Sequence, residues 1–428
     1  MQYTNVFVVL FFVGVFLDAA IHLSLGFIDY SFRKKHGMEI PPEVGASVDK
    51  ETLSRTCAYE DAKHFFSVPE ILVSLALKVY LAASGFYPAV FETVFTWTGS
   101  AFLVNVLFLL FISVPDAIVG IPFSLYRVFG IEKKFGFCKQ TFGMWIVDAV
   151  KEAVVSAVLA LPLVAVAGFL FRVAPSSWWI FLAAAYIAFS LAVSVIYPVF
   201  IAPLFNKFTP LEDGELKSRL DSLLARCHFR SGGLFVMDAS RRSGHSNAYF
   251  TGFGKTKRVV LYDTLIEQLT PAEIEAVLGH ELGHFKKHHI IRRMLVVIPV
   301  VFAALFVVSL ALRYPSLYEG FGFSVMKEAG GEVSHRMMMA GLVLFGIVFS
   351  GFSPLAGVVL NFFSRRDEFQ ADAFSAEVCG GCEELVSALV KLNKENLSEM
   401  QVPKIYSVFH YNHPPLLERI RALREKKL

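Results

Sequence analysis

Charged side chains are scarce in this chain of 428 residues, since Asp, Glu, Lys and Arg together make up 18% of it, against about a quarter in soluble domains. Hydrophobic residues make up 55%, compared with roughly 45–50% in soluble domains. The formal net charge of +3 is too small to indicate binding to nucleic acid. The sequence therefore predicts a protein that resides in a lipid bilayer and has no nucleic-acid partner.

The cysteines are few and odd in number, five in all, which argues against a disulfide framework. Cys379 and Cys382 have the spacing of a redox motif or of half a zinc site. No second pair with this spacing and no predicted strand before them supports either function. We interpret these two residues as free thiols at a helix turn.

Long apolar runs account for the excess of hydrophobic residues. Residues 1–5 contain no Lys or Arg, so the first run is interpreted as a retained membrane helix and not as a signal peptide. The seven runs cover approximately residues 6–27, 68–87, 99–123, 150–171, 178–204, 294–312 and 337–363. Each is near the roughly 20 residues that a helix needs to span a bilayer.

The basic residues of the connecting segments predict the orientation of these spans. Lys and Arg are frequent between the first and second, third and fourth, and fifth and sixth runs, and in the C-terminal tail. Residues 88–98 and 173–177 carry none, and residues 313–336 have only Lys327 between flanking arginines. By the positive-inside rule, the N-terminus lies outside and the C-terminal tail lies in the cytoplasm.

Several ionisable residues fall inside the apolar runs. Asp18, His22 and Lys78 are the deepest of them. A charge in lipid is costly unless it faces protein or water. These residues indicate either a polar cavity between the helices or side chains that reach the membrane interface, and the sequence does not decide between the two.

The stretch 270–289 contains His280, Glu281 and His284 in the spacing H-E-x-x-H. Residues four apart lie on one face of a helix, so both histidines can direct a ring nitrogen at one metal ion. Zinc lowers the pKa of a water molecule, and a neighbouring carboxylate such as Glu281 can accept its proton. The alternative is an ordinary amphipathic helix with two surface histidines.

Residues before the motif predict where this helix begins. Residues after the motif predict what surrounds the end of the helix. Thr270 precedes Pro271 and has Glu273 three residues after it, which is the pattern of a capping box with proline at the first helical position. Basic residues come after the motif, and we expect them to contact lipid headgroups instead of the metal: Lys286, Lys287, His288 and His289.

A catalytic zinc site needs a third protein ligand. Lys287 and Ile290 occupy the positions where an extended H-E-x-x-H-x-x-G-x-x-H motif has Gly and His, which excludes that class. In residues 364–372, Glu368 and Asp372 are four apart and share a helix face. Glu368 can bind zinc while Asp372 accepts from the ring N–H of His280 or His284. By itself such a stretch would be interpreted as a solvated helix face.

Residues 205–269 are predicted to form a small α+β layer. Its elements are a helix over residues 213–228 and strands near residues 233–237, 245–252 and 258–262. Gly252 and Gly254 mark the turn between the last two strands.

These motifs together resemble those of the type I CAAX prenyl endopeptidases, which are integral-membrane zinc metalloproteases of the gluzincin kind. The resemblance rests on LGHELGHFKKHH paired with SRRDEFQADAFS, and on IYPVFIAPLFNKFTPL, HSNAYFTGFG, RVVLYDTLI and HPPLLERI. It covers nearly the whole chain. It implies a mostly α fold, in which a barrel-like chamber of seven transmembrane helices carries an α+β gluzincin protease domain on its cytoplasmic side.

The resemblance also implies roles for single residues. One zinc ion per chain would be bound by His280, His284 and Glu368, with Glu281 as general base and acid, and Asp372 would orient a ligand histidine. His413, in the H-P-P motif, would donate a hydrogen bond to the tetrahedral oxyanion. The substrate backbone would pair with the strand that begins at Asn247, Ala248 and Tyr249. Without the resemblance, His413 would be interpreted as a loop residue and Asn247 equally well as a turn-former.

The function expected from the resemblance is endoproteolysis of C-terminal tails next to a prenylated cysteine. The alternatives are a broader quality-control metalloprotease of membrane proteins, or a non-catalytic membrane scaffold or transporter. The expected parts are five N-terminal membrane helices over residues 1–204, a zinc-protease segment over 205–290, two further membrane helices over 291–363, and the rest of the protease domain over 364–428.

The expected partners are the lipid bilayer and a prenylated or extended peptide, with a monomer favoured. Residues 313–336 are short, and the C-terminal Glu-Lys-Lys-Leu differs from a dilysine retrieval signal. Both features favour a bacterial inner-membrane protein, while a eukaryotic source would place the chain in the endoplasmic reticulum.

Overall fold

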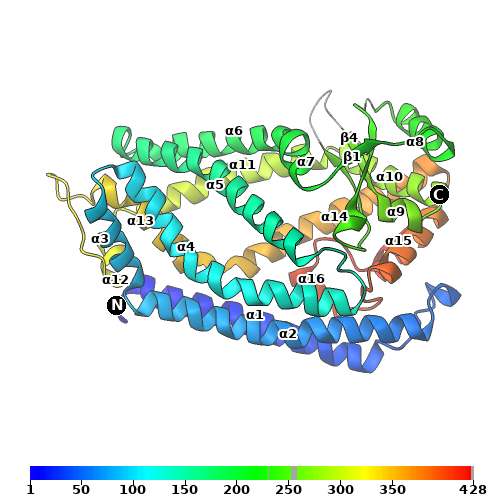
Figure 1. Cartoon of the computed structure of the whole chain (residues 1–428), viewed down its shortest axis with the longest axis horizontal. Coiled ribbons are helices and arrows are strands. Elements are labelled where there is room, and N and C mark those ends of the chain that lie inside the picture. The colour runs from blue at the N-terminus through cyan, green and yellow to red at the C-terminus, as the bar shows by residue number, and fades with distance from the viewer. Residues whose placement is uncertain (230, 252–257, 426–428) are drawn as a thin grey trace.

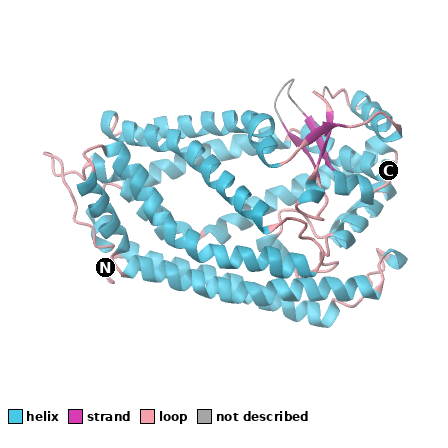
Figure 2. Cartoon of the chain, in the orientation of Figure 1, coloured by secondary structure: helices cyan, strands magenta, loops and turns pink. Residues whose placement is uncertain are grey.

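The computed structural model describes residues 1–229, 231–251 and 258–425 of the chain. The predicted turn at Gly252 and Gly254 and the last three residues of the C-terminal sequence lie outside these ranges. Long helices run along the long axis of the molecule (Figure 1). The N-terminus lies at one end, whereas the strands and the C-terminus lie at the other end (Figure 2).

Most predicted membrane runs lie on long helices. In the described part of the chain, six helical segments are long and apolar enough to cross a membrane. They are α1 (Val6–His36), α2 (Lys50–Ala83), α4 (Ala101–Leu125) with the π-helix Tyr126–Glu132, α5 (Phe142–Val173), α6 (Trp178–Ile196) with the π-helix Tyr197–Ile201 and α7 (Ala202–Phe205), and α11 (His289–Ala311). The multi-pass membrane architecture is therefore confirmed.

The helices are longer than the apolar runs that predict them. Helix α2 has 34 residues and therefore extends about 51 Å, well beyond the roughly 30 Å of a hydrocarbon core. Its first half is too polar for a hydropathy signal, which detects only the part in lipid. The predicted loop over residues 88–98 is also mostly helical, because α3 (Phe86–Trp97) connects α2 to α4. The loop prediction was wrong there.

The seventh run is divided between two helices. Helices α13 (Met338–Ser350) and α14 (Ser353–Cys379) are bent by 73° at the break between them, where the sequence predicts one span. A Cβ atom on Gly351 would lie 2.1 Å from the carbonyl carbon of Gly14 in α1. The bend therefore packs directly on the α1 backbone, which requires glycine at Gly351.

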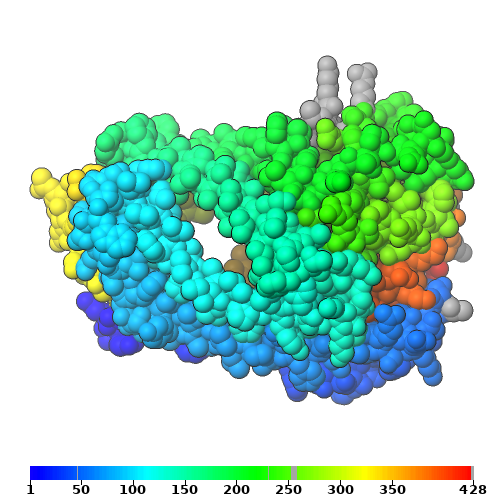
Figure 3. Space-filling model, in the orientation of Figure 1, coloured from blue at the N-terminus to red at the C-terminus, as the bar shows by residue number. Residues whose placement is uncertain are grey.

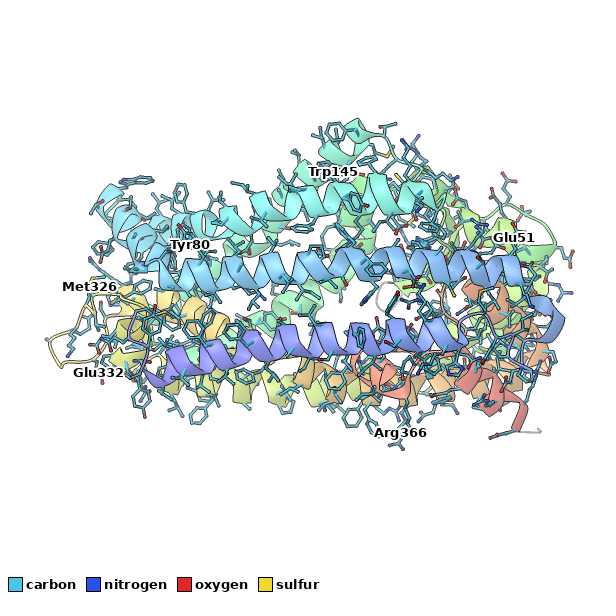
Figure 4. All side chains as sticks on the ribbon, turned by 90° about the horizontal axis from the view of Figure 1, so that it is seen from below. Glu51, Tyr80, Trp145, Met326, Glu332 and Arg366 are labelled. Carbon is cyan, nitrogen blue, oxygen red and sulfur yellow. The ribbon has the colours of Figure 1, made fainter. Side chains whose placement is uncertain are left out.

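The transmembrane helices surround an internal space. Viewed from below, α1 and α2 lie side by side along the molecule, with Glu332 at one end and Glu51 at the other (Figure 4). The space-filling view shows an opening among the helices that leads into the interior (Figure 3). The main apolar cluster of these helices includes the buried residues Phe11, Phe108, Phe171, Trp178, Leu312, Tyr318 and Phe321. The predicted chamber is confirmed.

The ionisable residues deep in the predicted spans contact one another. His22 Nε2 lies 3.5 Å from one oxygen of Asp18, and Lys78 Nζ lies 3.8 Å from the other. The pair of Asp18 and Lys78 joins α1 to α2. Mutual pairing lowers the cost of charge in the membrane.

A four-stranded sheet forms the predicted small α+β layer. The strands β1 (Phe208–Pro210), β2 (Leu234–Met237), β3 (Ala248–Thr251) and β4 (Arg258–Tyr262) are arranged in the order β1-β2-β4-β3. Strands β2 and β4 are parallel, and the other two pairings are antiparallel. Strand β1 was not predicted, because three residues after a membrane helix are too few for a periodic signal.

Six helices either pack on this sheet or continue from it into the C-terminal part of the described chain. They are α8 (Glu215–Arg226), α9 (Asp263–Gln268), α10 (Pro271–Lys286), α15 (Glu383–Glu395), α16 (Lys404–His410) and α17 (Leu416–Glu425). Buried leucines of α8, β4, α9 and α10 form the core that joins the sheet to its helices: Leu220, Leu223, Leu261, Leu265, Leu278 and Leu282. Cys379 ends α14 and Cys382 precedes α15. Both are free thiols, as predicted.

Candidate metal centre

The helix that carries the H-E-x-x-H motif begins as its sequence predicts. Thr270 accepts from the backbone N–H of Glu273 at 3.3 Å, and the Glu273 carboxylate accepts from the N–H of Thr270 at 2.8 Å. This capping box satisfies two of the N–H groups at the start of α10. Glu273 also accepts from Ser387 and Lys391 of α15. The start of α10 is therefore fixed against α15.

Small residues bring α10 and α14 into close contact. A Cβ atom on Gly283 would lie 2.8 Å from Cα of Ala371, and one on Gly279 would lie 3.0 Å from Oγ of Ser375. Ser375 donates to the carbonyl oxygen of Ala276 at 2.6 Å. The backbones can approach this closely only because both positions in α10 are glycine. The contact places the histidines of α10 directly against the acidic face of α14.

Three metal-binding side chains converge between these helices. One donor atom each from His280, His284 and Glu368 lies within 4.8 Å of the other two. The two Nε2 atoms are 3.2 Å apart, and the carboxylate oxygens of Glu368 lie 3.4 Å from Nε2 of His280 and 3.2 Å from Nε2 of His284. His280 and Glu368 are buried, and His284 is partly buried.

These separations fit a small tetrahedral cation. Bonds of 2.0–2.1 Å from zinc to nitrogen and oxygen put neighbouring ligand atoms about 3.3–3.4 Å apart. Among the described residues, Oε2 of Glu368 is buried without a hydrogen-bond partner, which is unfavourable unless another group binds that oxygen. Two imidazoles and a carboxylate are also a donor set that zinc prefers. The residues present therefore fit a bound divalent metal.

Asp372 holds the first histidine and is itself neutralised by an arginine. Its Oδ1 lies 2.7 Å from Nδ1 of His280. Arg419 of α17 donates to Oδ1 at 2.6 Å and to Oδ2 at 2.9 Å. A carboxylate accepts only, so Nδ1 of His280 carries the proton and Nε2 presents its lone pair to the site.

The surroundings shift the pKa of both His280 and Glu281 upward. Burial alone would lower the pKa of His280, but its hydrogen bond with Asp372 and the Glu368 carboxylate beside Nε2 outweigh burial and raise that pKa to about 9. A divalent cation supplies the positive charge that these carboxylates stabilise. Desolvation by the surrounding protein raises the pKa of the Glu281 carboxyl above its ordinary value, against the opposing effect of His280 and His284.

His413 lies in the loop after α16, beside the same group of side chains. Nε2 of His413 lies 3.4 Å from Oε1 of Glu368. Asn361 of α14 donates to the carbonyl oxygen of Phe409 at 2.8 Å. Arg365, one turn further along α14, donates to three carbonyl oxygens at or beside the end of α16: Ser407, Val408 and Tyr411. The helix that carries Glu368 therefore also fixes the loop that carries His413.

The predicted substrate strand lies at an edge of the sheet. Strand β3 pairs only with β4 among the described strands. Asn247 is exposed just before β3, and its side-chain oxygen accepts from the N–H of Ala248 at 2.8 Å. Tyr249 directs its ring toward Met237 and Tyr262 on the sheet. Tyr249 can therefore contact an added strand through its backbone, whereas its side chain belongs to the sheet.

Comparisons with known proteins bear on both halves of the chain. The family model described as CAAX prenyl protease N-terminal, five membrane helices, matches residues 29–207. The model of peptidase family M48 matches residues 210–427. This chain belongs to peptidase family M48.

Relatives of this M48 chain match over most of its length. The CAAX prenyl protease 1 homolog of Arabidopsis thaliana is 37% identical over 392 residues, which cover 90% of each chain. The homolog of Homo sapiens is 32% identical over 91% of this chain and 89% of its own. The crystal structure of S. mikatae Ste24p is similar with a TM-score of 0.90 and 33% identity, over 97% of this chain and 98% of that one. The chain is therefore a membrane metallopeptidase and works with a metal ion.

The structure of this M48 chain brings together all the residues predicted for the metal centre, and it adds two that were missed. Arg419 lies 47 residues after Asp372, and no spacing rule links them. His289 was expected to contact lipid headgroups, which was wrong, because it is 2% exposed. Its Nδ1 lies 2.9 Å from Nδ1 of His284. The five-residue interval between these histidines does not place them on one helix face.

Proposed function

We propose that this chain is a zinc endopeptidase that removes the C-terminal tail next to a prenylated cysteine. The convergence of His280, His284 and Glu368 beside Glu281 carries this proposal. Its substrate class comes from the similarity to CAAX prenyl proteases 1, which extends over about 90% of the chain. One zinc ion per chain would be held by the two imidazoles and the Glu368 carboxylate.

Bound zinc would supply a Lewis acid that lowers the pKa of water and polarises the scissile carbonyl. Glu281 takes a proton from the attacking water and passes it to the leaving amine. Its desolvated position supports this role, because a raised carboxyl pKa makes Glu281 a stronger base toward the attacking water. Asp372 keeps the proton of His280 on Nδ1 and so leaves Nε2 free to bind.

His413 and the sheet edge would position the substrate. Nε2 of His413 faces the site, 3.4 Å from Glu368. Nδ1 of His413 lies 2.7 Å from the side-chain oxygen of Asn412, so the protonated ring would donate through Nε2 to the oxyanion that develops at the scissile carbonyl. The extended substrate would pair with the outer edge of β3, from Asn247 to Tyr249, by strand addition. The side chain of Asn247 is exposed next to this edge.

The protease unit and its sidedness are inferred from the same arrangement. We propose that residues 205–290 and 364–428 form one protease unit, since α10 is fixed to α14 and α15, while 1–204 and 291–363 form the membrane part. The cluster Arg33, Lys34 and Lys35 ends α1, far from the N-terminus at the other end of the molecule (Figure 1). By the positive-inside rule the metal centre faces the cytoplasm.

The compartment and the oligomeric state are also proposals. The relatives named above are eukaryotic, which favours the endoplasmic reticulum over the bacterial inner membrane that the short segment 313–336 suggested. We propose that the chain acts as a monomer, because all the residues of the site come from one chain.

A cleavage assay with two peptides tests the substrate class. The purified protein should cleave a farnesylated CAAX peptide at least tenfold faster than the same peptide without the prenyl group. Equal cleavage rates for the two peptides would rule out specificity for the prenyl group and would favour a broader, quality-control type of protease. Cleavage of neither peptide, together with no bound zinc, would leave a non-catalytic membrane scaffold or transporter.

Replacing the general base tests the mechanism. Glu281→Gln should lower turnover by at least 10³-fold, because the amide cannot accept the proton from water, while the zinc content stays at one per chain. Metal analysis of the purified variant and single-turnover cleavage check both parts. Cleavage by Glu281→Gln near the wild-type rate would rule out this mechanism.

A further inference from the structure

His289 sits where the backbone takes an uncommon conformation. His288, between α10 and α11, has φ 56°, in the left-handed region that a side chain other than glycine adopts rarely. This residue lies between the end of α10 and the start of α11. His289, the first residue of α11, is 2% exposed, and its ring lies next to the ring of His284 at a centroid distance of 5.0 Å.

The contact between the two rings requires one donor and one acceptor. Nδ1 of His284 and Nδ1 of His289 are 2.9 Å apart, and a neutral imidazole carries a proton on only one of its nitrogens. If Nδ1 of His284 donates, its Nε2 has a free lone pair and can bind a metal. If it accepts, Nε2 carries a proton and cannot bind. The direction of this one hydrogen bond therefore decides whether His284 is a ligand.

Gln370 and Arg292, which lie on the far side of His289, determine the direction of the hydrogen bond between the two rings. Arg292 has only donors, and its Nη2 lies 3.1 Å from Oε1 of Gln370 and 2.7 Å from Oδ1 of Asp367. The same Oε1 of Gln370 lies 3.2 Å from Nε2 of His289. Because Arg292 can only donate, Gln370 presents its oxygen there, and Nε2 of His289 must donate to that oxygen. Nδ1 of His289 is then the acceptor, and Nδ1 of His284 is the donor.

We propose that His289 is a positioning residue of the metal centre. It accepts from Nδ1 of His284 and keeps the lone pair of Nε2 directed at the metal, and Arg292 sets this polarity through Gln370. The two ligand histidines would thus be held by different groups, His280 by the carboxylate of Asp372 and His284 by a neutral imidazole. This inference rests on the proposed zinc site.

The experiment measures how fast zinc leaves the purified full-length protein when a chelator is added. His289→Phe keeps a ring of similar size but removes the acceptor, and it should speed zinc loss by about 10–100-fold. His289→Asn retains an acceptor oxygen near the position of Nδ1 and should stay within a few-fold of wild type. Gln370→Met, a milder change, should speed zinc loss by less than His289→Phe.

His288→Asn is the matched control, since it replaces the neighbouring exposed histidine and asparagine tolerates a positive φ. It should lose zinc at the wild-type rate. Wild-type rates in both His289→Phe and Gln370→Met would overturn the inference, as would equally fast loss from His289→Asn and His289→Phe. Wild-type protein that holds no zinc would instead overturn the proposed function. If His289→Phe does not fold, Gln370→Met and His289→Asn decide the question.

Discussion

Asp372 accepts hydrogen bonds from two side chains, which together hold its carboxylate in place. Its Oδ1 receives Nδ1 of His280 and one N–H of Arg419, and its Oδ2 receives a second N–H of Arg419. Asp372 is 2% exposed and Arg419 is 9% exposed. Removing the positively charged partner of a buried carboxylate strongly lowers the stability of the folded protein. Removing both charges together lowers it much less.

Arg419→Met is therefore expected to destabilise the folded protein by about 3–5 kcal/mol. Thermal unfolding of the purified protein in detergent measures the change. The double variant Arg419→Met with Asp372→Asn should recover part of the loss, because no unpaired charge remains and the amide oxygen still accepts from His280. An unfolding temperature of Arg419→Met equal to that of wild type would contradict this account.

At the scale of elements, the contact of α10 with α14 depends on Gly283. A Cβ atom there would meet the backbone of Ala371 at 2.8 Å, so the helices must separate to accept alanine. We expect Gly283→Ala to lower the free energy of unfolding by about 1–3 kcal/mol. It should also weaken zinc binding, because His284 and Glu368 lie on opposite sides of this contact. Zinc content after dialysis and the unfolding temperature check the two effects.

Gly357 provides the control for that substitution. It lies in α14, and a Cβ atom there would meet nothing within 4 Å. Alanine at this position should leave zinc binding unchanged and stability equal or slightly higher, since alanine favours helix. If Gly283→Ala and Gly357→Ala behaved alike, the close helix contact would not be what assembles the site.

His245 links the sheet to two other elements. Its Nε2 lies 3.2 Å from Glu132 at the end of the π-helix after α4, and its Nδ1 lies 2.9 Å from Asn396 after α15. Its ring also stacks on Phe137 at 4.0 Å. Burial alone would lower the pKa of His245, but the hydrogen bonds with Glu132 and Asn396 raise it above its ordinary value of 6.5.

A raised pKa in the folded state means that protonated His245 favours folding. This contribution is fully present below pH 6.5, the ordinary pKa of the group, and is lost as the pH rises through the folded-state pKa. The difference in unfolding temperature between wild type and His245→Gln should therefore be larger at pH 6 than at pH 9. The same difference at both pH values would show that protonation of His245 does not stabilise the fold.

At the scale of the whole molecule, α1 contacts the bend of the last membrane crossing. The contact is between the backbones of Gly14 and Gly351, and a Cβ atom on Gly351 would lie 2.1 Å from its neighbour. It joins the first transmembrane helix to α13 and α14, which are the last ones in the chain. The ring of helices around the interior is therefore closed by a backbone contact that has no room for a side chain.

Gly351→Ala is expected to lower the free energy of unfolding by about 1–3 kcal/mol or more. Neither the backbone at Gly351 nor the one at Gly14 can move aside unless a whole helix moves. Gly346→Ala, within the neighbouring helix α13, should be neutral, because a Cβ atom there meets nothing within 4 Å. The unfolding temperatures of the two variants, compared in one detergent, check this. Equal stability of both would show that α1 does not depend on this contact.

Sequence alone predicted most of the residues that form the candidate metal centre. His280, Glu281 and His284 were recognisable because helix geometry converts a four-residue interval into a shared face, and the same rule linked Glu368 to Asp372. The membrane helices were recognisable because each must present about 20 apolar residues to lipid. The capping box of Thr270 and Glu273 was also readable, because it is a local pattern over four residues.

Other features depend on how distant segments pack. Asp372 lies 92 residues from His280 along the chain and Arg419 lies 139 residues from it, so no interval in the sequence marks their contact. The burial of His289 beside His284 and Gln370 was not predicted, because Gln370 belongs to a different helix. The bend of 73° between α13 and α14 is fixed by a contact with α1.

The sequence by itself thus determined which segments enter the membrane and which residue types are available to hold a metal, because both depend on composition and on spacing within one helix. Only the tertiary structure decided which side chains lie beside each histidine of the candidate site. Those choices depend on hydrogen-bond partners that different helices supply, and packing alone brings such partners into hydrogen-bonding distance.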